Sequence, residues 1–180
     1  MSIKEPGATE LDAIRKAGLR PEVVGCFFND NKLLFLFDDR YKVWGLPQGG
    51  IDNGEMPSAA LNREMEEELG KDFVNKCDTC IVLGRCTLMG EDHIFFPAST
   101  KVEKVLKTDD GTEVPMKGKE YLFYAVQTQS QSLDIKKTEF ERHSWLTHEK
   151  ALQLADDMPQ KGKQKITREA ISLLKENKFI

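Results

Sequence analysis

The residues from Gly49 to Gly70 concentrate carboxylates where most folds avoid them, and this run constrains the chain more than any other feature. It ends in the octapeptide Arg63-Glu64-Met65-Glu66-Glu67-Glu68-Leu69-Gly70. Pro57 suits the first turn of a helix, and Gly70 suits the left-handed residue that follows the last turn. The pattern therefore predicts a helix that includes residues 64 to 68.

The predicted helix has an apolar face and an acidic face side by side. At about 100° per residue, one arc of roughly 80° holds apolar residues and an adjoining arc of roughly 100° holds carboxylates. The apolar arc contains Leu61, Met65 and Leu69, and the acidic arc contains Glu64, Glu67 and Glu68. Like charges three and four positions apart repel by a few tenths of a kcal/mol each. The acidic arc therefore needs either full solvation or a cation.

A solvated surface helix is the ordinary explanation of an isolated E-x-x-E-E pattern. The segment before the helix favours a cation instead. Residues 44 to 55 form the glycine-rich stretch Trp-Gly-Leu-Pro-Gln-Gly-Gly-Ile-Asp-Asn-Gly-Glu, which predicts a tight loop with exposed backbone carbonyls. Carboxylate and carbonyl oxygens are the ligands of hard divalent ions such as Mg²⁺, which often shares its shell with substrate phosphates.

The spacing of these residues resembles a known family motif. From Gly49 to Lys71 the chain matches the Nudix box, G-x5-E-x7-R-E-U-x-E-E-x-G-U, where U is a bulky apolar residue. Every fixed position is present, including Glu55 and Arg63, and the one departure is Lys71 at the final apolar position. The resemblance implies a Nudix-like α/β/α sandwich, that is, a mixed α/β (α+β) fold with a loop-helix-loop catalytic motif beside the sheet.

The resemblance also implies a set of site residues. Two or three Mg²⁺ ions, with Mn²⁺ as a substitute, would be bound by the carbonyl of Gly49 and the carboxylates of Glu64, Glu67, Glu68 and Glu139. Either Glu64 or Glu139 would accept the proton of the attacking water. Arg63 is expected to act by orientation, paired with the structural residue Glu55.

The flanks resemble the branch of RNA pyrophosphohydrolases and dinucleoside polyphosphate hydrolases. The more specific of the matching segments are Pro47-Gln48-Gly49-Gly50 and Glu139-Phe140. Substrate-binding roles are implied for Arg20, Gln48, Gly50 and Lys119. The expected reaction is hydrolysis of a phosphoanhydride bond, either to remove 5′ pyrophosphate from RNA or to cleave dinucleoside polyphosphates. Two alternatives stay open, because the box specifies chemistry and not the leaving group: a hydrolase of nucleoside diphosphate sugars or modified nucleotides, and a non-catalytic binding module.

Composition limits the number of domains, the partners and the location that the chain can have. The chain has 180 residues and a net charge of −4, which fits one domain without global attraction to nucleic acid. Neither a secretory signal nor a membrane span is recognisable, so we expect a cytoplasmic protein, and no protein partner is implied. Two segments are locally basic, an arrangement that most often serves solubility. They contain Lys101, Lys104, Lys107, Lys117 and Lys119 in the first and Lys161, Lys163 and Lys165 in the second.

The four cysteines offer a weak zinc signal. Cys77 and Cys80 form a C-x2-C pair, but Cys86 and His93 are too loosely spaced to complete a structural zinc site. Reduced, partly buried thiols are the expected state.

Apolar patterning predicts the other elements. Strands are expected at residues 23–28 and 32–37, joined as a hairpin through Asn29-Asp30-Asn31, and at 80–83, 121–126 and 144–146. Helices are expected at 147–156 and 167–175. We expect residues 1–19 to be an amino-terminal extension with a short helix near residues 11 to 16, and residues 20–180 to form a single domain. Residues 88–120 lack a clear pattern, and loops of that length are usually functional or mobile.

Overall fold

The computed structural model describes residues 3–90 and 104–180. In chain order its elements are α1 (Ala8–Lys16), β1 (Leu19–Asn29), β2 (Lys32–Asp38), β3 (Val43–Gly45), β4 (Gln48–Gly50), α2 (Pro57–Leu69), α3 (Lys71–Val74), β5 (Cys77–Met89), β6 (Val105–Lys107), β7 (Glu113–Pro115), β8 (Gly118–Thr128), the 3₁₀ helix η2 (Ile135–Lys137), β9 (Arg142–Thr147), α4 (His148–Asp156) and α5 (Lys161–Glu176).

A mixed seven-stranded sheet forms the centre of the molecule. Its main path runs β3-β2-β1-β8-β5, with β4 paired to β1 and β9 paired to β2. The pair β1–β8 is parallel, whereas β5 and β8 pair antiparallel along most of their length. The parallel register places Arg20 opposite Lys119 and Glu22 opposite Tyr121. Segments about a hundred residues apart in sequence therefore meet in the middle of the sheet.

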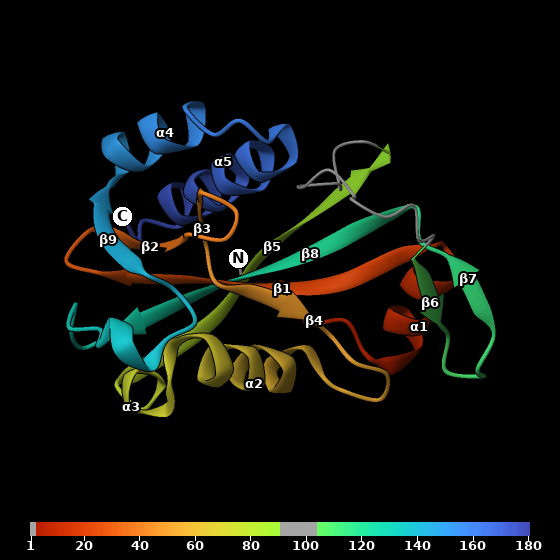
Figure 1. The fold of residues 1–180 in the computed structure, drawn as a ribbon. Coiled ribbons are helices and arrows are strands. Elements are labelled where there is room, and N and C mark those ends of the chain that lie inside the picture. Colours follow the sequence, from red (N-terminus) through yellow and green to blue (C-terminus); the bar gives the residue numbers. More distant parts are fainter. Residues whose placement is uncertain (1–2, 91–103) are drawn as a thin grey trace.

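Helices cover both faces of this sheet (Figure 1). Helices α4 and α5 lie on one face, where a buried cluster includes Val24, Phe35, Tyr121, Phe123 and Ile171. Helices α2 and α3 lie on the other, where a second cluster includes Val23, Phe27, Leu61, Met65 and Tyr124. Residues next to each other in β1 contribute to opposite clusters, because successive side chains of a strand point to opposite faces. The expected α/β/α sandwich is confirmed.

The hairpin between β1 and β2 also agrees with the sequence prediction. Asp30 and Asn31 have φ angles of 48° and 57°. Two consecutive residues with positive φ make the turn type whose twist matches that of paired strands, and Asn and Asp tolerate this conformation better than most residues.

Several element bounds differ from the sequence predictions. Strand β5 extends beyond residues 80–83 at both ends, and α5 begins at Lys161 instead of residue 167. Polar residues continue β5 because its backbone pairs with β8 along the strand, a stabilisation that apolar patterning does not reveal. Within the unpatterned segment 88–120, the β6–β7 hairpin and the start of β8 are ordered elements. Residues 91–103, with His93 and Lys101, lie outside the described part.

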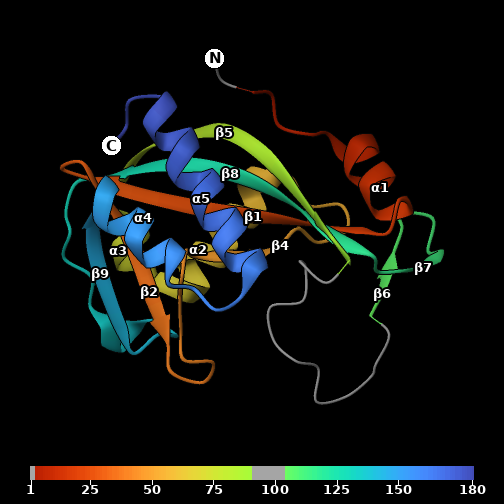
Figure 2. The same ribbon diagram turned by 90° about the horizontal axis from the view of Figure 1, so that it is seen from above.

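The amino-terminal residues form part of the packed structure. Helix α1 buries Leu11 against the cluster beneath α2, and Ile14 packs beside it. Seen from above, α1 lies next to the β6–β7 hairpin (Figure 2). In the part of the chain that the structure describes, no helix combines the length and the apolar character needed to cross a membrane.

Candidate active site

Helix α2 presents its carboxylates at an electrostatically unfavourable end. Ala60, Leu61, Met65 and Leu69 are buried against the sheet, which leaves Glu64, Glu67 and Glu68 on the flank of the helix. Glu66, Glu67 and Glu68 lie in the last turn, where the partial negative charge of the helix dipole repels carboxylates. That turn contains no basic residue. The arrangement costs stability, which is typical of residues kept for function and not for folding.

Strand β4 places Gly49 directly against this helix and Gly50 against Arg20 of β1. It pairs with β1, and flanking bonds from the Gly25 amide to the Pro47 carbonyl (2.9 Å) and from the Ile51 amide to the Pro21 carbonyl (3.0 Å) fix its position. A Cβ on Gly49 would overlap the carboxylate of Glu64, and a Cβ on Gly50 would overlap the guanidinium of Arg20. A side chain at position 49 would have to displace Glu64, whereas one at position 50 would have to displace only the end of the Arg20 side chain.

Arg63 holds the loop and the helix together. Its Nε and Nη2 donate to the two carboxylate oxygens of Glu55 at 2.9 and 2.8 Å, and Nη2 also donates to the Gly50 carbonyl at 2.9 Å. Nη1 donates to Glu64 at 2.6 Å. The pKa of Arg63 is raised by the hydrogen bonds to Glu55 and then to Glu64, and the same pair lowers the pKa of Glu55. The structure shows the expected Arg63–Glu55 ion pair.

Glu68 and Glu139 meet at a small cavity of about 180 Å³. The carboxylate of Glu68 accepts a hydrogen bond from the Gln48 amide at 3.1 Å, and the Glu139 amide donates to the Glu68 carbonyl at 3.2 Å. Burial raises the pKa of Glu68 to about 8, and repulsion from Glu64 and Glu139 acts in the same direction. The fold therefore brings Glu139 to the carboxyl end of α2 even though it lies far along the chain.

Lys163, at the start of α5, also lines this cavity and was not among the predicted site residues. Its Nζ lies close to where a Cβ on Gly45 would be, and burial lowers its pKa while the charge of Glu68 acts in the opposite sense. The sequence placed Lys163 in a segment expected to serve solubility. A lysine in the first turn of an amphipathic helix gives no sign that it points inward.

A group of basic side chains lies beside the acidic helix. Lys119 Nζ is 2.7 Å from a carboxylate oxygen of Glu22, and Arg20 Nη1 is 3.4 Å from the same oxygen. Glu22 is only 2% exposed and was not predicted. Its one sequence signal is an acidic residue at the start of an apolar strand. Because a buried carboxylate must be paired, Glu22 keeps both cations at this end of β1.

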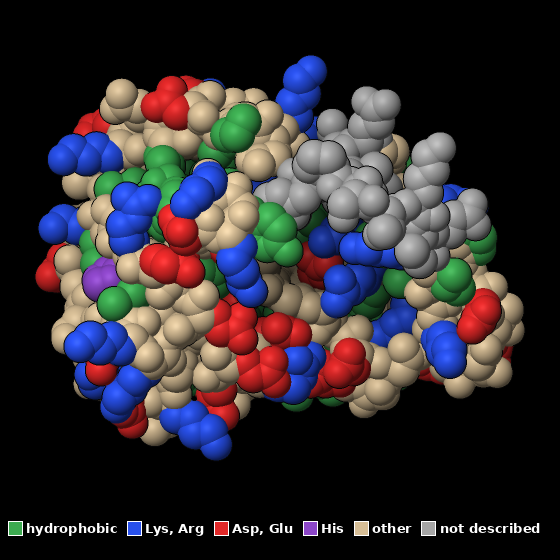
Figure 3. Space-filling model, viewed as in Figure 1, with side chains coloured by type: hydrophobic (Ala, Val, Ile, Leu, Met, Phe, Trp, Pro, Cys, Tyr) green, Lys and Arg blue, Asp and Glu red, His purple; other side chains and the backbone are tan. Residues whose placement is uncertain are grey.

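The two kinds of charge are adjacent on one face of the molecule. Figure 3 shows Asp and Glu side chains gathered over β4 and α2, and Lys and Arg side chains gathered over the amino-terminal part of β1. The surface between them is hollowed. An anionic substrate could contact the basic side while its reacting phosphate lies near the carboxylates.

The donor set fits a hard divalent cation. Among residues 3–90 and 104–180, no three His, Cys, Asp or Glu side chains already lie in position to hold a metal ion. Glu64 is paired with Arg63. The charges of Glu64 and Glu139 nevertheless both act on Glu68, raising its pKa. Oxygen donors with excess negative charge suit Mg²⁺ or Mn²⁺ better than softer ions.

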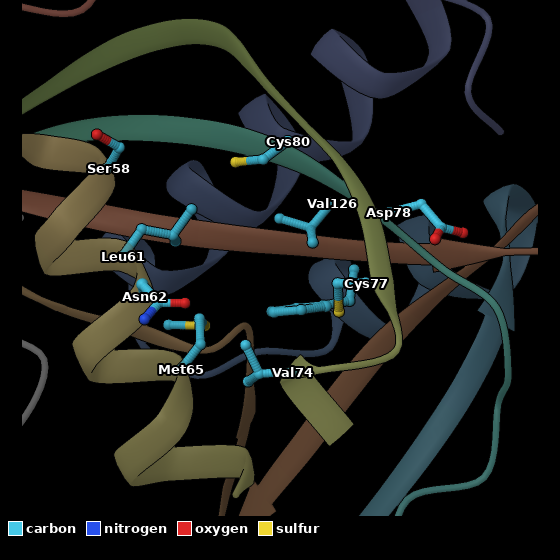
Figure 4. Close-up of a pocket in the computed structure, with 10 residues that line it drawn as sticks. Ser58, Leu61, Asn62, Met65, Val74, Cys77, Asp78, Cys80 and Val126 are labelled. Carbon is cyan, nitrogen blue, oxygen red and sulfur yellow. The ribbon is translucent and has the colours of Figure 1, made fainter. Parts of the chain in front are cut away.

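The cysteines lie apart from this cluster, and none of the four is in a disulfide. Cys77 and Cys80 line an apolar cavity of about 230 Å³, together with Leu61, Met65 and Val126 (Figure 4). The cavity lies between α2 and the sheet, on a different face of the helix from the carboxylates. Burial raises the pKa of Cys77 to about 11, so this thiol is protonated at neutral pH. The expectation of reduced thiols agrees with this geometry.

Comparison with known protein families identifies the family of this chain. The model of the NUDIX domain matches residues 18–169. The chain belongs to the Nudix family. Among curated Nudix proteins, an RNA pyrophosphohydrolase of a Nitratiruptor species is 40% identical over 67 residues, which cover 34% of this chain and 43% of the relative. Nudix hydrolase 25 of Arabidopsis thaliana is 45% identical over 56 residues, covering 29% of this chain and 31% of the relative. The chain thus spans less than half the length of either curated relative.

Solved Nudix structures share the fold at low identity. A dihydroneopterin triphosphate pyrophosphohydrolase of E. coli has a TM-score of 0.58 at 14% identity, covering 86% of this chain and 97% of its own. A NUDIX hydrolase from Nitrosomonas europaea has the same TM-score and identity, covering 89% of this chain and 90% of its own. These likenesses support the Nudix sandwich and leave the substrate open.

Proposed function

We propose that this Nudix protein is a metal-dependent hydrolase of a phosphoanhydride bond in a nucleoside-linked polyphosphate. The observation that carries the proposal is the acidic group of Glu64, Glu68 and Glu139 next to the basic pair Arg20 and Lys119. A polyphosphate is attracted to the basic pair and repelled by the carboxylates. A cation bound by the carboxylates reverses that repulsion.

Mg²⁺ is the proposed cofactor, with Mn²⁺ as a substitute, held by the Gly49 carbonyl and by Glu64, Glu67, Glu68 and Glu139. When bound, the ions would lower the pKa of water and neutralise charge on the phosphoryl group and its leaving group. Arg20 and Lys119 bind the remaining phosphates, and the backbone at Gln48 and Gly50 lines the substrate path. Glu64 or Glu139 accepts the proton from the attacking water. Arg63 keeps Glu64 oriented through its bonds to Glu55 and Gly50.

Within this class, we propose 5′ pyrophosphate removal from RNA or cleavage of dinucleoside polyphosphates. Support comes from the stretch shared with proteins named RNA pyrophosphohydrolase, which is 40% identical over 67 residues in the Nitratiruptor relative. Further support comes from Glu139, whose position at the cavity matches the extra carboxylate that this branch supplies from a loop.

A substrate panel tests the proposal. Phosphate and pyrophosphate release would be measured with 5′-triphosphorylated RNA, a dinucleoside tetraphosphate and a nucleoside diphosphate sugar, each with Mg²⁺ and with chelator. We expect release from one of the first two substrates in the presence of Mg²⁺ alone. Turnover of the nucleotide sugar alone would select the alternative hydrolase class. No turnover of any substrate, with normal binding of nucleotide, would select the non-catalytic module.

The nature of the metal site has a separate test. After chelation, we expect Mg²⁺ or Mn²⁺ to restore activity and Zn²⁺ to fail, because the donors are all oxygen atoms. The double variant Cys77→Ser/Cys80→Ser should keep the same metal dependence. Loss of bound metal in that variant would instead place a zinc ion at the cysteines.

A further inference from the structure

Three consecutive carbonyls of the catalytic loop accept hydrogen bonds from two arginines. Arg63 donates to the Gly50 carbonyl at 2.9 Å. Nη2 of Arg15 donates to the carbonyls of Ile51 at 3.0 Å and of Asp52 at 2.9 Å. Arg63 belongs to the Nudix box, whereas Arg15 lies in α1, outside the residues 18–169 that match the family model. The loop is thus held from one side by the catalytic helix and from the other by the amino-terminal helix.

The burial of Arg15 shows that this contact is specific. The residue is 3% exposed, and burying a guanidinium is costly unless its donors are satisfied. The two loop carbonyls supply acceptors, and Asp109 supplies a counter-charge at 3.6 Å from Nη1. Both bonds come from Nη2, whose hydrogens lie in the fixed plane of the guanidinium, so the two neighbouring carbonyls are held in defined directions.

A continuous series of bonds runs from Arg15 to the catalytic carboxylate. Beyond the two carbonyls, Asp52 and Glu55 exchange bonds, with the Glu55 amide donating to the Asp52 carbonyl at 3.2 Å and the Asp52 amide donating to the Glu55 carboxylate at 3.0 Å. Glu55 pairs with Arg63, and Arg63 donates to Glu64 at 2.6 Å. A change in the position of Asp52 would therefore be transmitted to Glu64 through directional contacts.

The β6–β7 hairpin is part of the same corner, beside α1 (Figure 1). Nδ2 of Asn53 donates to the Lys107 carbonyl and to Asp109 Oδ1, both at 3.0 Å. The Asp109 amide in turn donates to Asp12 in α1 at 2.7 Å. Helix, hairpin and catalytic loop are thereby bonded pairwise, so Arg15 does not depend on α1 alone for its position.

We propose that Arg15 is a positioning residue for the hydrolytic reaction, and that α1 is an integral part of the active site and not an accessory extension. It acts through the Ile51 and Asp52 carbonyls and does not touch the substrate. The inference rests on the proposed function for its kinetic consequence only, because the loop contact itself can be measured without turnover.

The experiment compares Arg15→Met with Arg85→Met in the full chain. Arg85 pairs with Glu10 and Glu120 and so also ties α1 to the sheet, away from the catalytic loop. We expect both variants to lower Tm. Only Arg15→Met should lower kcat, by about tenfold or more with KM within about twofold, because small misplacements of catalytic groups are costly. Arg15→Lys should fall between wild type and Arg15→Met, because a lysine ammonium can donate to the carbonyls but lacks the fixed plane of the guanidinium and its second nitrogen near Asp109.

Amide hydrogen exchange in residues 48–55 gives the second readout. In Arg15→Met we expect faster exchange there than in wild type or in Arg85→Met; if Arg15→Met does not fold, Arg15→Lys replaces it. Unchanged exchange together with unchanged kcat would overturn the positioning role. An equal loss of kcat in both variants would show a merely structural role. If wild type hydrolyses none of the substrates, the proposed function fails, and the exchange measurement still decides whether Arg15 orders the loop.

Discussion

Gly49 and Glu64 lie so close together that the carboxylate of Glu64 fills the space that a side chain on Gly49 would need. The contact joins β4 to the middle of α2 and places a backbone segment proposed to bind metal beside a proposed catalytic carboxylate. Glycine at this position is favoured by the close contact and not by backbone conformation, since its φ is not in the left-handed region.

Gly49→Ala tests this contact directly. The new methyl group must displace Glu64. We expect kcat to fall by about a hundredfold, because a small misplacement at an active site suffices for that loss, while Tm changes little. Gly7→Ala is the matched control, because a Cβ there meets nothing within 4 Å. Steady-state kinetics in which the two variants behave alike would contradict the close-contact interpretation.

A second prediction concerns the carboxylates on the flank of α2. Glu67→Gln and Glu68→Gln each remove a charge from the proposed metal site while keeping the shape, so we expect turnover to fall by about two orders of magnitude or more. Thermal melting of the metal-free proteins at neutral pH should show an intact fold. Glu68→Gln should be more stable than wild type, because the raised pKa of Glu68 means that the carboxyl must take up a proton on folding, and glutamine avoids that cost. Glu66→Gln serves as control, since Glu66 pairs with Asn62 and Lys71 away from the site. Near-normal turnover of both variants at saturating Mg²⁺ would refute the metal assignment.

Glu139→Gln should impair catalysis more than substrate binding. Glu139 lines the cavity beside Glu68, and its charge would act mostly in the transition state, so kcat and kcat/KM should fall together. Glu141→Gln is a close control, because Glu141 instead accepts the Asp39 amide at 2.7 Å, on the outside of the loop. If neither variant differs from wild type, Glu139 is a solvated surface carboxylate.

The Glu55–Arg63 pair predicts a pH-dependent contribution to stability. The hydrogen bonds from Arg63 lower the pKa of Glu55 below its ordinary 4.5, so folding favours the ionised form. The stabilisation is fully present above pH 4.5 and is lost as pH falls through the lowered folded pKa. Chemical denaturation should show Glu55→Gln less stable than wild type by about 1–2 kcal/mol at pH 7. The difference should shrink as pH falls below 4.5 and through the lowered folded pKa, and a difference independent of pH would contradict the ionic origin.

The sequence alone determined the features that depend on neighbours along the chain. Helical periodicity was enough to place Glu64, Glu67 and Glu68 on one flank of α2, because residues three and four apart share a helix face whatever the rest of the fold does. The turn at Asp30 and Asn31 was predictable for the same reason, since its chemistry is local. The Arg63–Glu55 pair was implied by the box, whose spacing brings the loop back over the helix.

Only the tertiary structure decided the contacts between distant segments. Glu22 meets Lys119 because β1 and β8 pair in parallel, and neither strand specifies its partner or register in its own residues. Glu139, before β9, and Lys163, at the start of α5, reach the same cavity beside Glu68. Arg15 is the clearest example, since an arginine in a short polar helix predicts solvent exposure. Its burial against Ile51 and Asp52 follows from the docking of α1, which depends on the complete sheet and not on the sequence around residue 15.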